Sequence, residues 1–282
     1  MGNIRTFILM AALTALLMGI GWLLGGRGGM IFALIFAGAT NVWAWWNSDK
    51  AMLRQQGAIP VSPQSAPELY QLAADLAHRA QIPVPAIYLI DTDQPNAFAT
   101  GRNPQNAAVA VTRGIMQTLN RDELAGVIAH ELAHIKHRDT LTMTVAATIA
   151  GAIAMLGNMF MFSGMMGNRD NQNGGGNALG GLLAIILGPI AAALVQMAVS
   201  RAREFEADRG GAEISGKPLA LASALAKIQN AAGRTVNIPA ERNPAAASMY
   251  IINPLHALRM DRLFATHPAT EDRIARLQAL AR

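Results

Sequence analysis

Four long apolar stretches constrain this chain more than any other feature. They cover residues 6–24, 30–46, 141–162 and 179–199. A run of about 20 apolar residues is long enough to cross a bilayer as a helix. Only 15% of the residues are charged, below the roughly 25% of ordinary soluble domains, and the deficit is concentrated in these stretches. The sequence therefore predicts a mainly α membrane protein with four transmembrane helices.

A metal-binding motif, His130-Glu-Leu-Ala-His134, lies within a predicted helix over residues 120–138. Residues four apart share one face of a helix, so the imidazoles of His130 and His134 can bind the same ion. Glu131 lies on the flank, where it can reach a water on that ion. This spacing is typical of zinc metallopeptidases, and a chain without cysteine has no thiolate alternative.

The third metal ligand is expected directly after the fourth apolar stretch. A catalytic zinc site needs three protein ligands and an open position for water. If the helix continues there, Glu204 and Asp208 share one face and Glu206 points away. Glu204 can supply a carboxylate, and Asp208 can accept the second N–H of a ligating histidine. A solvated charged helix end is the alternative. His137 shares a face with His130, but a fourth protein ligand would close the site.

Between residues 47 and 139 the composition is that of a soluble domain. Ser65-Ala-Pro-Glu68 predicts a helix that opens with a capping box and runs to about Ala80, and Asn120 with Glu123 predicts the same start for the metal helix. Three short strands are expected at residues 86–90, 96–101 and 107–112. Together these elements predict an α+β zincin-like catalytic domain, with a small β-sheet beside the HExxH helix.

A peptidase must hold its substrate in an extended conformation, and an exposed strand edge does this by accepting the substrate as another strand. Residues 96–101 are short and flanked by Pro95 and Gly101, as expected of an edge, whereas residues 107–112 suit the interior of a sheet. The predicted substrate-binding edge consists of Ala97, Phe98, Ala99 and Thr100. Phe98 would either line a side-chain pocket or pack as core, and an edge strand without a ligand is the alternative.

Taken together, the motifs resemble the HtpX family of membrane zinc metalloproteases, relatives of the prenyl-protein CAAX proteases. The resemblance extends along nearly the whole chain and rests on residues 96–101, 130–134, 200–208, 253–255 and 266–268, with Arg273. It implies one zinc ion held by His130, His134 and Glu204. It also implies that Glu131 is the catalytic residue and that Asp208 hydrogen-bonds a metal ligand without contacting the ion. It also implies the turnover of damaged or misassembled membrane proteins under stress.

His267 is a further candidate, as a donor to the oxyanion, because Pro268 stiffens its loop and the resembled family has a histidine there. A structural histidine is the alternative. Two other functions are possible for such a chain: a zinc-binding membrane holdase or scaffold without proteolysis, and a membrane-anchored metal-binding or transport protein. Glu131 weighs against the first, and the lack of acidic or histidine residues inside the apolar stretches weighs against the second.

The expected domain organisation alternates between membrane and catalytic parts. Residues 1–46 form a transmembrane hairpin, 47–139 the first catalytic part, 140–199 a second hairpin, and 200–282 the second catalytic part. Arg27 and Arg169 are the only basic residues in the two loops opposite the catalytic parts, so these parts should face the cytoplasm of a bacterial inner membrane. Expected partners are the lipid bilayer and membrane-protein or unfolded polypeptide substrates. The net charge of +5 forms no dense patch, which argues against nucleic acid.

Overall fold

The computed structural model describes residues 2–145, 201–232, 250–252 and 268–281. In chain order the elements are α1 (Gly2–Gln55), β1 (Ile59–Val61), α2 (Pro67–Ala80), β2 (Ala86–Ile90), β3 (Ala97–Asn103), β4 (Asn106–Thr112), α3 (Arg113–Thr118), α4 (Arg121–His137), α7 (Arg201–Ser215), α8 (Pro218–Ala232) and α10 (Thr270–Leu280). The described chain is thus mainly helical with one small sheet. His267 and most of the third and fourth apolar stretches lie outside the described residues.

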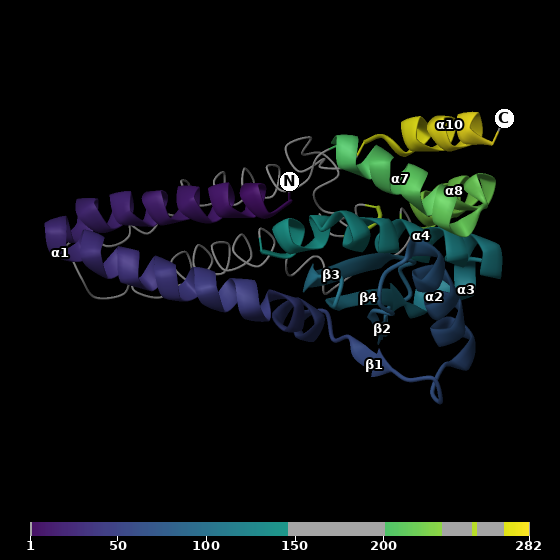
Figure 1. Ribbon diagram of the computed structural model, residues 1–282, viewed down its shortest axis with the longest axis horizontal. Coiled ribbons are helices and arrows are strands. Elements are labelled where there is room, and N and C mark those ends of the chain that lie inside the picture. The colour runs from purple at the N-terminus through teal and green to yellow at the C-terminus, as the bar shows by residue number, and fades with distance from the viewer. Residues whose placement is uncertain (1, 146–200, 233–249, 253–267, 282) are drawn as a thin grey trace, which may run out of the picture.

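The sheet is mixed, with the strand order β1-β2-β4-β3 (Figure 1). β2 pairs with β4 in parallel, and the two outer pairs, β1 with β2 and β3 with β4, are antiparallel. The three predicted strands are confirmed, with β3 at an edge and β4 in the interior as expected. The sequence did not predict β1, because Ile59-Pro60-Val61 is too short for an alternating pattern and contains a proline.

Side chains alternate between the two faces of the sheet, and each face is buried against a different core. Ala97 and Ala99 belong to the core shared with α4, and Phe98 belongs to a second core with Met52 of α1. Phe98 is 1% exposed, and its ring lies 5.2 Å from that of Tyr250 in an edge-to-face arrangement. Of the two alternatives for Phe98, the structure therefore supports packing as core.

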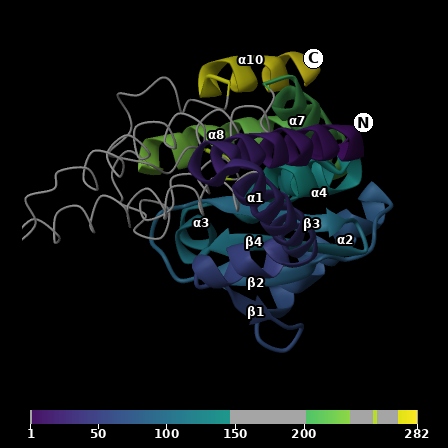
Figure 2. The ribbon, with the colours of Figure 1, turned by 90° about the vertical axis from the view of Figure 1, so that its left-hand side faces the viewer.

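The metal helix α4 lies between the sheet on one side and α7 and α8 on the other, with α10 above them (Figure 2). It begins with the predicted capping box: Glu123 N–H donates to the Asn120 side chain, and Asn120 N–H donates to the Glu123 carboxylate. Glu123 also accepts from Ser223 and Lys227 of α8, at 2.7 and 2.8 Å. The same carboxylate therefore caps α4 and attaches α8 to it.

The absence of a side chain at Gly211 allows α7 to approach α4 at the metal histidine. A Cβ at this position would lie 2.9 Å from both the Cα and the backbone nitrogen of His130. Backbone atoms cannot move aside as a flexible side chain can. Only glycine lets the helix that carries Glu204 pack at this distance.

The predicted capping box at the start of α2 is wrong. The N-cap is Ala66, which makes no side-chain cap hydrogen bond, and Pro67 occupies the first helical turn. The Ser65 hydroxyl instead donates to the Ser62 carbonyl oxygen and accepts from the Ser62 N–H. Short side chains such as serine often bond to nearby backbone in turns, and here that local turn is formed in place of the cap.

The first two apolar stretches both lie within α1, which folds back on itself to form two arms (Figure 1). Gly26, with φ of +56°, lies in the glycine-rich stretch that was predicted to turn the chain. Among the residues that the structure describes, no helix meets the combined length and hydropathy required to cross a membrane.

Candidate metal centre

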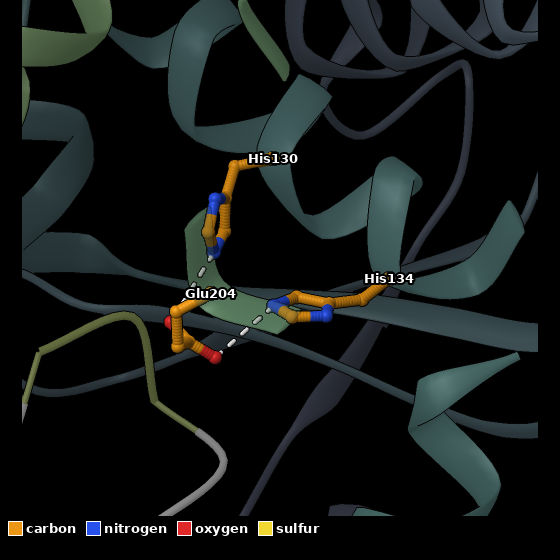
Figure 3. A group of neighbouring side chains, drawn as sticks. All are labelled: His130, His134 and Glu204. Atoms are coloured by element: carbon orange, nitrogen blue, oxygen red, sulfur yellow. Dashed lines mark ion pairs between the residues drawn. The ribbon is translucent and has the colours of Figure 1, made fainter. Parts of the chain in front are cut away.

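Three buried side chains converge between α4 and α7 (Figure 3). His130 and His134 come from successive turns of α4, and Glu204 comes from the first turn of α7. Glu204 lies 3.9 Å from His130 Nε2 and 3.4 Å from His134 Nε2. One ligand atom from each residue lies within 4.8 Å of the other two.

This arrangement fits a zinc ion. Zinc–ligand bonds of about 2 Å in tetrahedral geometry require donor atoms roughly 3–4 Å apart, and two imidazoles with one carboxylate are a common catalytic donor set. All three side chains are buried, so water solvates them poorly. Arg273 Nη1 lies 3.6 Å from Glu204, and a metal ion would add to the positive charge that stabilises this carboxylate. His130, His134 and Glu204 are the residues that would hold the ion. His137, which was not expected to be a ligand, is exposed.

A carboxylate lies next to the Nδ1 atom of each ligating histidine. Asp208 Oδ1 is 3.0 Å from His130 Nδ1, the contact predicted from the sequence, and Asp139 Oδ2 is 3.3 Å from His134 Nδ1. Both contacts leave the Nε2 atoms facing Glu204, and Arg273 Nη2 also lies 3.5 Å from His130 Nε2. Carboxylates in this position fix the tautomer and the orientation of a ligating imidazole.

Arg273 of α10 is fully buried beside these groups. Its guanidinium binds Asp208 through two parallel contacts of 2.7 and 2.8 Å, and donates to the Ile251 carbonyl oxygen at 2.8 Å. Burial alone would raise the pKa of Asp208, but the Arg273 charge and its hydrogen bonds lower that pKa to about 2. Asp208 is therefore ionised at neutral pH and able to accept from His130.

In the metal-free protein the pKa values of the two histidines are shifted in opposite directions. Burial lowers the pKa of His130, and this effect prevails over its contact with Asp208. Burial acts on His134 in the same direction, but hydrogen bonds to Asp139 and Glu204 and the nearby carboxylates raise its pKa to about 10. Metal binding must displace this proton, so acid will oppose metal binding.

Glu131 lies beside the ligands and is 2% exposed. Burial raises its pKa to about 7, although the charge of His134 and the Ala99 N–H, which hydrogen-bonds the carboxylate, act in the opposite direction. A carboxyl group with a pKa near neutral can both accept and return a proton. The site therefore combines three metal donors with an adjacent acid–base group.

A model of peptidase family M48 matches residues 63–281, which contain every one of these groups. This chain belongs to peptidase family M48. The peptidases of family M48 are zinc-dependent, so the expected family of zinc metalloproteases is confirmed. The fold is similar to that of a solved structure, the crystal structure of S. mikatae Ste24p, with a TM-score of 0.52 and 17% sequence identity. The match covers 98% of this chain and 64% of Ste24p, so the chain spans less than two thirds of that protein.

Within this M48 fold, the structure brings together five of the residues that the sequence singled out: His130, Glu131, His134, Glu204 and Asp208. The four residues of the predicted substrate edge, Ala97 to Thr100, lie in β3 next to Glu131, and their role stays a prediction. No role was predicted from the sequence for Asp139, Arg203 or Arg273. The position of Asp139, two residues beyond the end of the metal helix α4, was a signal that could have been used.

Proposed function

We propose that this chain is a membrane-bound zinc endopeptidase that cleaves misfolded, damaged or misassembled membrane proteins. The observation that carries the proposal is the buried set of His130, His134 and Glu204, with Glu131 directly beside it. A metal that served structure alone would need no acid–base group at that position. Membership of family M48 supports the same activity.

Zinc in this site would supply the Lewis acidity that polarises the scissile carbonyl and makes a water nucleophilic at neutral pH. Glu131 accepts the proton of the attacking water and returns it to the leaving amine. The Ala99 N–H holds the Glu131 carboxylate in place for both transfers. Asp208 keeps the imidazole ring of His130 oriented. His267 remains our candidate for a donor to the developing oxyanion.

The edge of β3 is the proposed binding site for an extended substrate. It is less open than the sequence predicted, because residues 97–100 are all buried. The Ala97 carbonyl accepts from the Ile251 N–H at 3.0 Å, and the Gly101 carbonyl accepts from the Thr140 hydroxyl at 3.0 Å. Both partners occupy the outer side of the strand. Ala99, between these two positions, is where substrate would meet Glu131.

Proline substitutions can separate the two alanines of this edge. Ala97 and Ala99 are two residues apart and direct their backbone groups to the same outer side, but only the Ala99 N–H binds Glu131, whereas the Ala97 N–H bonds to the Asn96 side chain. We expect Ala99→Pro to lower cleavage of an unfolded polypeptide about 10- to 100-fold, the cost of one hydrogen bond to a charged group. Ala97→Pro should have a smaller effect. Bound zinc and melting temperature are measured alongside, and equal losses in two folded variants would remove the Ala99 N–H from the mechanism.

Attachment to a membrane is proposed from the surface of α1 as well as from the apolar stretches. Large apolar side chains along both arms are at least half exposed: Phe7, Ile8, Trp22, Ile31, Phe32, Ile35, Phe36, Val42, Trp43 and Trp46. An apolar surface of this extent marks contact with a partner or with lipid. Trp46 also packs against Arg102 of β3, whose guanidinium lies 4.3 Å from its ring centre. We propose four transmembrane helices, with lipid covering α1.

The orientation is tested with single cysteines, since the chain has none of its own. Ser163 lies in the predicted loop between the third and fourth apolar stretches, and Ser62 is exposed next to β1. We expect a membrane-impermeant thiol reagent to label Ser163→Cys in intact cells and to label Ser62→Cys only after lysis. The reverse pattern would place the catalytic part outside the cytoplasm.

Proteolysis itself is tested with purified protein and an unfolded membrane-protein substrate. We expect a chelator to abolish cleavage and stoichiometric zinc to restore it, because the three donors provide the only ligand set found among the described residues. A protein that binds zinc and prevents substrate aggregation but never cleaves would instead be the holdase or scaffold considered above.

A further inference from the structure

Asp139 mirrors Asp208 on the opposite side of the metal site. Each histidine of the ligand set presents Nδ1 to a buried carboxylate, at 3.0 Å for His130 and 3.3 Å for His134. Asp139 is 5% exposed, so its charge is removed from water to about the same extent as that of Asp208. A carboxylate buried to this degree is costly unless it is paired.

The end of α4 places Asp139 at this position. Arg138, the C-cap of the helix, adopts the left-handed conformation with φ of +61°, and its N–H bonds to the His134 and Ile135 carbonyl oxygens. This conformation is unfavourable for a residue with a side chain. Residues 139–145 then continue as helix. The turn at Arg138, a common way for a helix to end, brings Asp139 back against His134.

Arg203 holds the second oxygen of Asp139. Its Nη1 lies 3.2 Å from Asp139 Oδ1, while Asp139 Oδ2 faces His134. Arg203 directly precedes the ligand Glu204 in α7. Asp139 is therefore in contact with the last turn of the metal helix and with the first turn of the helix that carries the third ligand.

Both carboxylates are shared between an imidazole and a guanidinium, but in different ways. Arg273 binds both oxygens of Asp208, so Asp208 Oδ1 contacts the guanidinium and His130 Nδ1 together. Asp139 instead gives one oxygen to Arg203 and the other to the imidazole. The geometry of a histidine held through Nδ1, with Nε2 left for a metal, is that of a residue supporting a ligand.

We infer that Asp139 is a positioning residue of the metal centre, which orients His134 through Nδ1, and that Arg203 acts by holding Asp139. The inference rests on the proposed metal binding but not on proteolysis. It assigns each histidine its own carboxylate and each carboxylate its own arginine. The first pair of carboxylate and arginine is Asp208 with Arg273, and the second is Asp139 with Arg203.

The test measures metal affinity, by competition with a chelator, in full-length protein loaded with zinc or cobalt(II). We expect Asp139→Ala to weaken binding about 10- to 100-fold, the usual effect of losing such a partner. Asp139→Asn should lie between alanine and the wild type, because its amide oxygen still accepts from Nδ1. Melting in excess chelator reports any change in the metal-free fold. If Asp139→Ala does not fold, Asp139→Asn carries the comparison with the wild type.

Arg203 is tested in a double-mutant cycle with Asp139. If Arg203 acts only through Asp139, Arg203→Met will weaken metal binding in the wild type and have little further effect in Asp139→Ala. The matched control is Asp122→Asn, which breaks an acid–base contact of 2.6 Å with Lys217 at the opposite, exposed end of α4. We expect that variant to bind metal as the wild type does.

Two results would overturn the inference. One is Asp139→Asn and Asp139→Ala variants that fold and hold metal as tightly as the wild type. The other is weakened binding that is fully matched by destabilisation of the metal-free protein, since that would make Asp139 a residue of the fold alone. A wild-type protein that binds no metal at all would refute the proposed function itself. That failure is distinguishable from failure of the inference, because it is seen in the wild type and the inference is tested by comparing variants with a wild type that binds metal.

Discussion

Replacement of Glu131 by glutamine will leave zinc bound and reduce peptide cleavage by about 10²- to 10⁴-fold, the usual contribution of a general acid–base group. The substitution preserves the shape of the side chain and touches none of the three ligands, but an amide cannot accept the proton of the attacking water. Bound zinc is measured by elemental analysis and cleavage by single-turnover kinetics. A folded, zinc-loaded Glu131→Gln protein that cleaves at the wild-type rate would show that another group acts as the base.

The same variant has a second expected signature, in the stability of the metal-free protein. Burial raises the pKa of Glu131 from 4.5 to about 7. The stability associated with the protonated carboxyl is therefore fully present below pH 4.5 and is lost as the pH rises through 7. Glutamine never ionises, so metal-free Glu131→Gln should be more stable than the wild type at pH 8, by up to about 3 kcal/mol. The difference should vanish near pH 4.5, and melting curves at the two pH values measure it.

Removal of Glu204 will abolish metal binding and cleavage together. Glu204→Ala leaves two histidines on one helix, and two ligands do not make a stable zinc site at this position. We expect no stoichiometric zinc after dialysis and cleavage at the level of the chelated wild type. Glu206→Ala is the matched control, because Glu206 lies on the same helix, two residues further on, but is exposed.

Retention of zinc by Glu204→Ala at wild-type affinity would show that the third ligand lies elsewhere. That result would still be compatible with family M48, but not with the geometry in which Glu204 is within 4 Å of both imidazoles. Loss of zinc with retained cleavage would contradict the metal mechanism itself. The two outcomes are separated by measuring metal content and activity on the same preparation.

Local periodicity explains which parts of the site could be predicted from the sequence. His130 and His134 share a face because they are four apart, and so do Glu204 and Asp208, once α7 is helical. The capping box at Asn120 is equally local. Each of these predictions depends on a single element and on spacing within it, and tertiary packing does not change such spacing.

Contacts between distant segments could not be predicted in the same way. Nothing in the spacing indicates that Ile251 bonds to Ala97 and thereby covers the predicted substrate edge. Asp139 reaches His134 only because Arg138 adopts a left-handed conformation, for which arginine has no local preference. Arg273 was noted as part of a motif, but its placement against Asp208 depends on how α10 packs over α7.

The position of Glu204 on a separate helix has a consequence for the whole chain. Glu204 follows His134 by about 70 residues. An ion that binds both residues closes a loop of that length, and the entropy of closing it in the unfolded ensemble is about 4 kcal/mol from chain length alone. The chain has no cysteine, so no disulfide can close such a loop. The ion would constrain the unfolded chain as a disulfide does in a secreted protein. Chelation would then weaken the attachment of α7 to α4 as well as stop the chemistry, so that the stability of the catalytic part would depend in part on its supply of metal.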